Sequence, residues 1–426
     1  METLIILIFI AGYVAIVLEH KLSVNKSASA LLTGVLTWAL IALSSTNMEK
    51  TNEELLHHVS DIASILFFLM GAMTIVEVVA TYGGFEIITD KIHTRKTSTL
   101  LWIIAIIAFF MSAVLDNLTT TIVIIALLRK LIADSKTRLL FAGIVVIAAN
   151  AGGAWTPIGD VTTTMLWIGG QITTGNIMKQ LFLPSIVSLL VPLAISAMTL
   201  KGELPPVATD KNSHDSASAH FGKVIIFWAG MLGLLSVPVF KTLTHLPPFM
   251  GMMLSLGVIW VIGEMLIKNK DEHTQKRFNI LRALEKVDLP SVLFFLGILL
   301  AVSALENIGA LHHAAAWLDT HVSNQTIVVT IIGILSSIVD NVPLVAASMG
   351  MYSLEQYPVD HQFWELLAFC AGTGGSILII GSAAGVAAMG LEKIEFFWYM
   401  KKISLYALIG YFAGIGVFLL QKMIFA

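Results

Sequence analysis

Long apolar segments follow one another along almost the whole of this 426-residue chain, and they constrain its fold more than any other feature. A helix needs about 20 apolar residues to cross the roughly 30 Å hydrocarbon core of a bilayer. The sequence therefore predicts an all-α polytopic membrane protein. The apolar segments fall at about 3–18, 27–45, 61–81, 98–115, 139–170, 180–200, 222–243, 249–267, 288–311, 326–339, 363–391 and 396–421.

Composition supports this fold class. Charged residues make up 12% of the chain, about half the share of a soluble protein. That excludes an ordinary soluble enzyme and a nucleic-acid binder, and the net charge of −3 suggests no polyanionic partner. The single cysteine, Cys370, excludes an internal disulfide and a multi-cysteine metal site. The first apolar segment lacks the basic start and small-residue cleavage site of a signal peptide, so we expect it to be a membrane helix.

Two of the apolar segments lead into an Asp-Asn pair, Asp116-Asn117 and Asp340-Asn341. The apolar run after each pair is too short to cross the membrane, since the first would span about 16 Å as a helix. We predict that each pair is the tip of a re-entrant hairpin, which occupies about 98–133 in the first case and 326–354 in the second.

The distribution of basic residues predicts the orientation. With ten spans, two hairpins and the N-terminus outside, all but four of the 25 Lys and Arg residues lie on one side. This matches the positive-inside rule. We expect a multi-pass protein of the cell inner (cytoplasmic) membrane, with the first hairpin entering from the cytoplasm and the second from outside. The four exceptions are Lys50, Lys179, Lys241 and Lys422.

An internal repeat predicts two similar halves, residues 1–200 and 222–426, joined by a cytoplasmic linker at 201–221. Each half would hold five spans plus one hairpin, and because five is odd the second half would be inverted. Asp61 and Asp288, which start matching segments, are predicted to cap their helices. The matched motifs are Asp61-x-x-Ser64-x-Leu66-Phe67-Phe68-Leu69 with Asp288-x-x-Ser291-x-Leu293-Phe294-Phe295-Leu296, the two Asp-Asn pairs, and Gly152-Gly153-x5-Gly159 with Gly374-Gly375-x5-Gly381.

Each half also contains one apolar segment that glycines interrupt, at about 139–170 and 363–391. Three glycines and Pro157 lie between Asn150 and Thr164, and a similar cluster spans Gly372–Ser376. We expect these residues to unwind both helices. Exposed carbonyls at membrane depth are tolerated only where they line a cavity or are buried in protein. Together with amide, hydroxyl and carboxylate oxygens they would suit Na⁺ or Li⁺.

Three polar motifs recur around these interruptions: Asp116-Asn117-x-Thr119-Thr120, Asn150-x-Gly-Gly-x-x-Thr156-Pro157-x-Gly159-Asp160-x-Thr162-Thr163 and Ser336-x3-Asp340-Asn341-x-Pro343. With these motifs the chain resembles the NhaD-type sodium/proton antiporters of the ion-transporter superfamily, which also contains arsenite permeases and divalent-anion/sodium symporters. The resemblance implies an elevator-type fold, a homodimer, no cofactor, and exchange of Na⁺ or Li⁺ for H⁺.

The resemblance and the polar clusters together predict one set of cation- and proton-binding residues. Na⁺ is placed at Asp116, Asn117, Asn150 and Asp160. The second half has Ser382 where the first has Asp160, so two equal cation sites are not expected. The full set is Asp116, Asn117, Thr120, Asn150, Thr156, Asp160, Thr162, Thr163, Ser336, Asp340, Asn341 and Ser376.

Carboxylates within apolar segments are costly and are functional candidates by default. No Lys or Arg lies in the neighbouring apolar segments to pair with Asp116, and Asp340 is given the same role by symmetry. We predict that ionised carboxylates bind Na⁺ and that protonation releases it. Glu77 and Glu306 would either line a proton path or serve at helix ends.

Two relatives of the same superfamily remain as alternatives, a sodium-coupled anion symporter and an arsenite-type permease. The resemblance implies that anion symporters carry a neutral residue before the hairpin Asn. Here both hairpin tips carry Asp, which would repel an anion. An intramembrane aspartyl protease would need a Gly-x-Gly-Asp loop, and Gly159-Asp160 lacks the first glycine. A channel would need a continuous pore, whereas hairpins that enter from opposite faces suggest alternating access.

Overall fold

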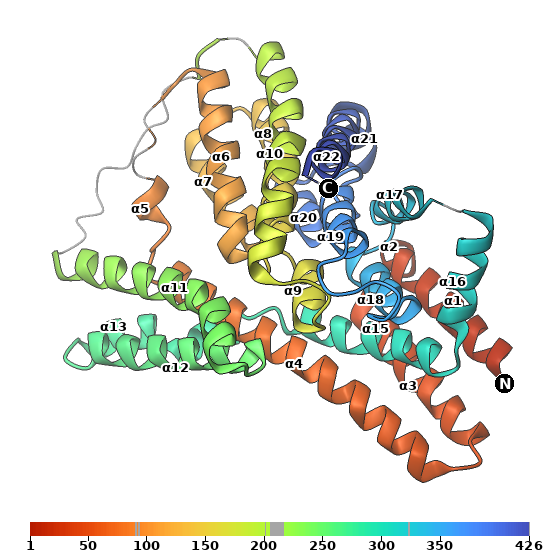
Figure 1. The fold of residues 1–426 in the computed structure, drawn as a ribbon. Helices are drawn as coiled ribbons and strands as arrows, with labels where there is room; N and C mark the ends of the chain where they lie inside the picture. The colour runs from red at the N-terminus through yellow and green to blue at the C-terminus, as the bar shows by residue number, and fades with distance from the viewer. Residues whose placement is uncertain (90–91, 93, 201, 205–216, 323, 426) are drawn as a thin grey trace.

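The computed structural model describes residues 1–89, 92, 94–200, 202–204, 217–322 and 324–425. Over these residues the chain is helical, and its only paired extended residues are Lys96 and Glu203, which form one isolated antiparallel bridge. Most of the predicted linker at 201–221, namely 201 and 205–216, lies outside the described residues. Figure 1 shows the helices in two groups, with the N-terminus in one and the C-terminus in the other.

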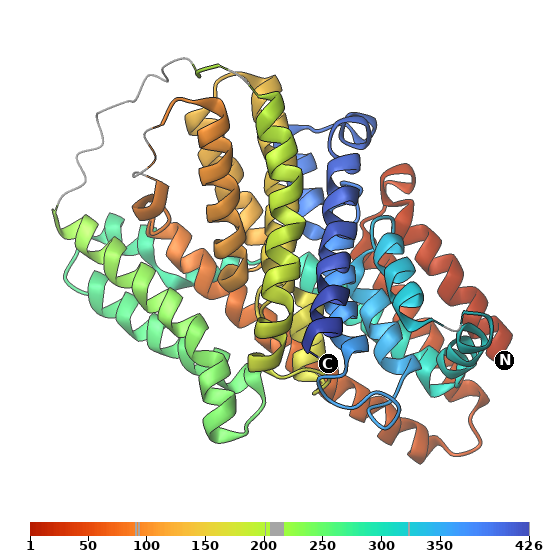
Figure 2. The same ribbon diagram turned by 45° about the horizontal axis from the view of Figure 1, so that its top comes forward.

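The first group lies along the lower and outer side of the molecule in Figures 1 and 2. Its helix α3 packs along α15 and α1, and the long helix α4 packs against α12, α15 and α11. Its main helices are α1 (Glu2–Val17), α3 (Lys26–Ser44), α4 (Met48–Thr81), α11 (Ala217–Thr244), α12 (Pro248–Ile267), α15 (Leu289–Asn307) and α16 (Ala310–His321).

The second group is a tighter bundle. Helix α8 packs against α6, α7, α10 and α19, and α10 packs along α22. Where the two groups meet, α9 contacts α4, and α18 contacts both α15 and α19. The bundle contains α6 (Thr97–Leu115), α7 (Asn117–Leu131), α8 (Ser135–Ala154), α9 (Val161–Ile168), α10 (Thr174–Thr199), α17 (Gln325–Leu335), α18 (Asn341–Met351), α19 (Gln362–Gly374), α20 (Ala383–Glu392), α21 (Phe396–Lys402) and α22 (Ser404–Phe425).

Length and composition explain why these segments are helices of a membrane protein. Among the described residues, nine helical runs are long and apolar enough to cross a bilayer. Large apolar side chains such as Leu32, Leu43 and Met265 are exposed on their outer faces, as a lipid solvent allows. Short helices connect the longer ones. These are α2 (Glu19–Leu22), α5 (Glu86–Thr89), α13 (Glu272–Phe278) and α14 (Ile280–Glu285).

The interruptions predicted in each half are present, but the glycines have a different role. Helix α8 continues through Gly152 and Gly153 and ends at Ala154, and α19 ends at Gly374. The unwound segments are therefore 155–160 and 375–382. A Cβ on Gly152 would lie 2.1 Å from the Phe109 carbonyl oxygen of α6. This glycine lets two backbones approach closely instead of unwinding its helix.

Other predicted helix boundaries were wrong. Helix α4 begins at Met48, where Asn47 accepts a hydrogen bond from the Lys50 N–H, so Asp61 lies inside the helix and does not cap it. Asp288 does cap α15, accepting from the Ser291 N–H. The segment predicted at 396–421 is two helices, because α21 ends before Ile403. Helix α16 was not predicted, since its sequence is too polar to span a membrane.

One buried carboxylate ties three helices of the bundle together. Glu392, at the end of α20, pairs with Arg129 of α7 at 2.6 Å and with Arg138 near the start of α8 at 2.7 Å. Removing one member of a buried ion pair leaves the other charge uncompensated. We expect Glu392→Gln to lower the free energy of unfolding by on the order of 3 kcal/mol. The loss would appear as a lower Tm of the purified protein in detergent.

An exposed ion pair supplies the control for that prediction. Glu272 pairs with Lys276 at 2.5 Å on the surface of α13, and both side chains are mostly solvated. Exposed pairs contribute roughly 0–1 kcal/mol, so Glu272→Gln should leave the Tm nearly unchanged. Equal Tm values for the two variants would show that Glu392 contributes no more than a surface charge.

Candidate functional site

Four helices begin at one cavity between the two groups. Asp116 caps α7, Asp160 caps α9, Asp340 caps α18 and Ser382 caps α20, each accepting a hydrogen bond from a backbone N–H of its helix. The cavity measures about 60 Å³, and all three aspartates line it, as does Ala383, the first residue of α20. Helix N-termini carry partial positive charge, which stabilises ionised carboxylates at this position.

A chain of buried amides connects the two halves at this point. The Asn117 amide donates to the Asp160 carboxylate at 2.6 Å and to the Asn150 Oδ1 at 3.0 Å. The Asn150 amide in turn donates to the Ser382 Oγ at 3.0 Å. Asn150 and Asp160 are almost completely buried. The sequence placed Na⁺ at Asp116, Asn117, Asn150 and Asp160, and the structure brings these residues together.

Asp116 has a backbone conformation that side chains rarely adopt. Its φ is 101° and its ψ is 161°, a region that is almost restricted to glycine and costs on the order of 1–3 kcal/mol. The carboxylate accepts from the Thr119 N–H at 2.7 Å and from the Thr119 Oγ1 at 2.9 Å. Strain of this kind is retained where the position of a side chain matters more than local stability. It sets the sharp junction between α6 and α7.

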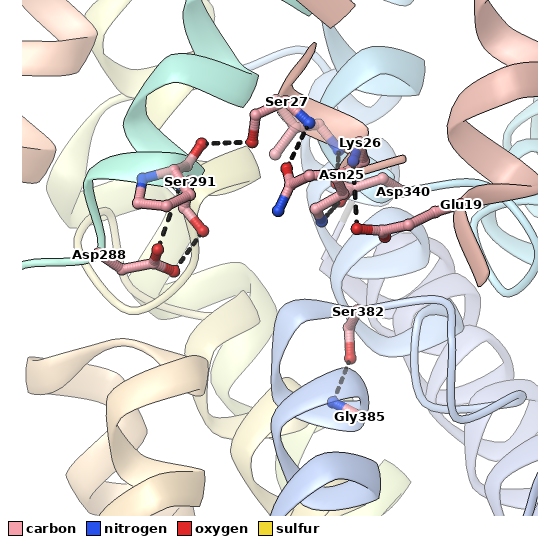
Figure 3. Close-up of polar contacts among 11 residues, drawn as sticks. Glu19, Asn25, Lys26, Ser27, Asp288, Ser291, Asp340, Ser382 and Gly385 are labelled. Atoms are coloured by element: carbon pink, nitrogen blue, oxygen red, sulfur yellow. Dashed lines mark hydrogen bonds and ion pairs between the residues drawn. The ribbon is translucent and has the colours of Figure 1, made fainter. Parts of the chain in front are cut away.

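Asp340 has a partner that the sequence analysis did not identify. The Lys26 ammonium, from the start of α3, lies 3.4 Å from the Asp340 Oδ2 (Figure 3). The absence of a neighbouring Lys or Arg was argued for Asp116 and carried over to Asp340 by symmetry, and this symmetry does not hold. The prediction failed because Lys26 precedes an apolar segment more than 300 residues away in sequence, and only tertiary packing brings it here. Asn341 lines the same cavity and is buried.

The predicted hydroxyl residues are buried around the cavity without lining it. Those that hydrogen-bond to backbone oxygens hold the unwound segments in place: Thr156 to Ala113 at 2.6 Å, Thr163 to Ala154 at 3.4 Å, Ser336 to Ala371 at 3.0 Å and Ser376 to Thr373 at 2.6 Å. Thr162 donates to the Asp160 carboxylate at 2.5 Å. The Thr120 hydroxyl is buried, and the described residues offer it no hydrogen-bond partner.

Equivalent contacts recur in the two halves. Ser112 donates to the Ala149 carbonyl at 2.6 Å, and Ser336, 224 positions later, donates to the Ala371 carbonyl, 222 positions after Ala149. Gly159 packs against the backbone of Ser112 as Gly381 packs against that of Ser336, since a Cβ on either glycine would lie 2.6 Å from the serine carbonyl oxygen. Both interruptions are thus held by the same set of contacts.

A larger cavity of about 570 Å³ adjoins the first and shares Lys26, Leu118 and Ser291 with it. Glu77 lines this larger cavity and pairs with Lys286 at 2.9 Å. Glu306 lines neither cavity and lies against Gly350 of α18. Of the two predicted proton-path residues, only Glu77 therefore faces the approach to the site.

Comparison with known proteins identifies the family. A family model described as citrate transporter matches residues 13–364. "Sodium/proton antiporter 1" of Arabidopsis thaliana is 50% identical over 97% of this chain and 71% of its own length. "Sodium/proton antiporter 2" of the same plant is 49% identical over 97% and 98%, and the "Na(+)/H(+) antiporter NhaD" of Vibrio cholerae is 32% identical over 97% and 91%. The chain belongs to the NhaD-type sodium/proton antiporters within this family. It is a multi-pass transporter and not an enzyme.

Several residues at the site of this NhaD-type chain were missed by sequence reasoning. Lys26, Ser291 and Thr164 line the small cavity, and Thr119 holds the Asp116 carboxylate. The Asp-x-x-Thr spacing of a helix cap could have identified Thr119. Nothing local marks Lys26, because a basic residue before an apolar segment is what the positive-inside rule produces everywhere.

Proposed function

We propose that this chain exchanges Na⁺, and also Li⁺, for H⁺ across the cytoplasmic membrane. The observation that carries the proposal is the set of three carboxylates that cap converging helices at one buried cavity. Carboxylate and amide oxygens are the ligands that hard monovalent cations prefer. The names of the relatives support sodium and protons as the transported ions.

The charges at the cavity favour a cation over an anion. Four helix N-termini without acidic caps would form a good anion site. Here three of the four caps are aspartates, so their carboxylates offset the positive helix ends and the Lys26 ammonium, and no excess positive charge is left to hold an anion. These carboxylates would repel the substrate of an anion symporter of the same superfamily. A neutral, arsenite-like substrate would not be repelled, and the ion-addition experiment below separates it from Na⁺.

Exchange follows from competition at the carboxylates. Na⁺ binds the ionised carboxylates, and protonation of the same groups releases it, because a ligand must lose its proton before it can hold a cation. The proposed Na⁺ ligands are Asp116, Asn117, Asn150 and Asp160. The other predicted residues of the set surround these ligands and complete the proposed cation- and proton-binding site. The larger cavity provides the approach from the cytoplasmic side, past Glu77.

We further propose that the chain is an inverted repeat, with halves at 1–200 and 222–426, re-entrant hairpins at about 98–133 and 326–354, and its N-terminus outside. The repeated serine and glycine contacts at offsets of 222 and 224 residues support the repeat. The bundle of α6–α10 and α17–α22 would move as one body against the first group, in an elevator-type motion within a homodimer. The separate packing of the two helix groups supports this division.

Everted membrane vesicles from antiporter-deficient cells test the proposed exchange. The vesicles are energised to an acid interior, and Na⁺, Li⁺, K⁺ or a dicarboxylate is added while a dye reports ΔpH. We expect Na⁺ and Li⁺ to dissipate ΔpH. The apparent KM for Na⁺ should rise as pH falls, by up to about tenfold per pH unit for one competing proton. No response to any cation, together with sodium-dependent dicarboxylate uptake in liposomes, would instead identify a symporter.

A further inference from the structure

Lys26 is held at the cation cavity by contacts on both sides of its backbone. It is the first residue of α3, whose cap Asn25 accepts from the Ser27 N–H at 2.8 Å, and the Lys26 N–H donates to Glu19 at 3.1 Å. Ser27 donates to the Pro290 carbonyl at 2.7 Å, which attaches this end of α3 to the start of α15. Figure 3 shows these contacts grouped beside Asp340. These hydrogen bonds fix the N-terminus of α3, and with it the backbone of Lys26, beside Asp340.

The ammonium points into the cavity. It lies 3.4 Å from the Asp340 Oδ2 and 4.4 Å from the centre of the Phe294 ring, so a carboxylate and an aromatic face both attract it. A lysine that only satisfied the positive-inside rule would extend toward lipid headgroups. Among the described residues that line the small cavity, Lys26 is the only Lys or Arg.

The two hairpin aspartates therefore differ in charge environment. Asp116 accepts hydrogen bonds from Thr119 and forms no ion pair within the described part of the chain. Asp340 faces a tethered cation. The 3.4 Å separation is longer than the 2.7–2.9 Å of a strong charge-assisted hydrogen bond, and the Lys26 side chain is 26% exposed. A pair of this kind can open without leaving a fully buried, unpaired charge.

We propose that Lys26 is a tethered competitor of the transported cation: its ammonium occupies the Asp340 carboxylate when the site is empty and gives it up when Na⁺ binds. This inference rests on the proposed exchange of Na⁺ for H⁺. Lys26 then limits the affinity for Na⁺, so that the ion can be released after transport. The Lys26 ammonium and the transported Na⁺ thus replace each other at the Asp340 carboxylate.

Other charges near Lys26 do not substitute for this role. Asp116 and Asp160 line the same small cavity, from α7 and α9. Glu19, Glu77 and Asp288 line the larger cavity together with Lys286. Lys286 is paired with Glu77, and Asp288 is the cap of α15, so both are engaged away from Asp340. Among the described residues, Lys26 is the cation that pairs with an aspartate of the site.

Two substitutions, one that removes the Lys26–Asp340 ion pair and one that strengthens it, test the inference. Lys26→Gln removes the charge, and we expect the apparent KM for Na⁺ to fall about tenfold with no rise in kcat. Lys26→Arg offers a planar, two-pronged donor that holds a carboxylate more firmly than an ammonium does. We expect it to raise the apparent KM several-fold. Both are measured as Na⁺-dependent proton release in proteoliposomes, alongside direct Na⁺ binding to the purified protein.

An exposed lysine supplies the matched control. Lys50 pairs with Glu54 at 3.6 Å on the surface of α4, so Lys50→Gln makes the same chemical change away from the cavity and should leave KM unchanged. If Lys26→Gln does not fold, the arginine variant still decides the question. A KM equal to that of the wild type in either folded Lys26 variant would overturn the inference. If the wild type itself shows no Na⁺ exchange, the proposed function fails first.

Discussion

Asp116→Asn should abolish exchange of Na⁺ for H⁺ while leaving the protein folded. Asparagine has nearly the same size and caps helices as well as aspartate, so α7 keeps its cap and the junction with α6 keeps its shape. The substitution removes one negative charge from a cavity that Asp160 and Asp340 also line. We expect the Na⁺-dependent rate in proteoliposomes to fall at least about 100-fold, which corresponds to a loss of about 2.7 kcal/mol in cation binding.

The chain offers a closely matched control for this prediction. Asp134 caps α8 with the same Asp-x-x-Thr geometry, accepting from the Thr137 N–H at 2.9 Å and from its Oγ1 at 2.7 Å. It is exposed, and the hydrogen bonds from Thr137 lower the pKa of its carboxyl. Asp134→Asn should transport at the wild-type rate. If Asp116→Asn also exchanged Na⁺ at the wild-type rate, Asp116 would not be a cation ligand.

Gly152→Ala should prevent stable folding of the bundle. A methyl group at this position would lie 2.1 Å from the Phe109 carbonyl oxygen, and backbone atoms of a packed helix cannot move away cheaply. We expect a loss of about 3 kcal/mol or more in the free energy of unfolding, seen as a much lower Tm or as aggregation in fluorescence-detected size-exclusion chromatography. Gly374→Ala should behave alike, because its Cβ would lie 1.9 Å from the Gly333 carbonyl oxygen.

Gly416 of α22 is the control for the glycine substitutions. A Cβ on Gly416 meets nothing within 4 Å, so Gly416→Ala adds no contact. Alanine is the better helix former by about 1 kcal/mol, and this gain applies equally to Gly152. The difference in Tm between the two variants therefore measures the steric clash alone. A Gly152→Ala protein as stable as the Gly416→Ala protein would show that α6 and α8 can separate without cost.

Most of the candidate site could be predicted from sequence because membrane burial makes polar residues conspicuous. Asp116, Asp160 and Asp340 stand out against apolar neighbours, and each caps a helix that begins at the cavity. The hydroxyl residues were harder to assign. Thr156 and Ser336 carry the same oxygen chemistry as a cation ligand, but the structure directs their hydroxyls to backbone carbonyls. Sequence shows which oxygens are available and not where each one points.

By itself, the sequence determined that this chain is a helical membrane protein with an interrupted helix in each half. These properties follow from local apolar length and from carboxylates placed at membrane depth, and neither requires knowledge of distant contacts. Only the tertiary structure decided that Gly152 and Gly374 serve close packing and that Lys26 pairs with Asp340. Both depend on which helices become neighbours. The glycines meet backbone 43 and 41 positions earlier in the chain, at Phe109 and Gly333, and Lys26 lies 314 positions from Asp340, so neither contact leaves a local trace in the segments that make it.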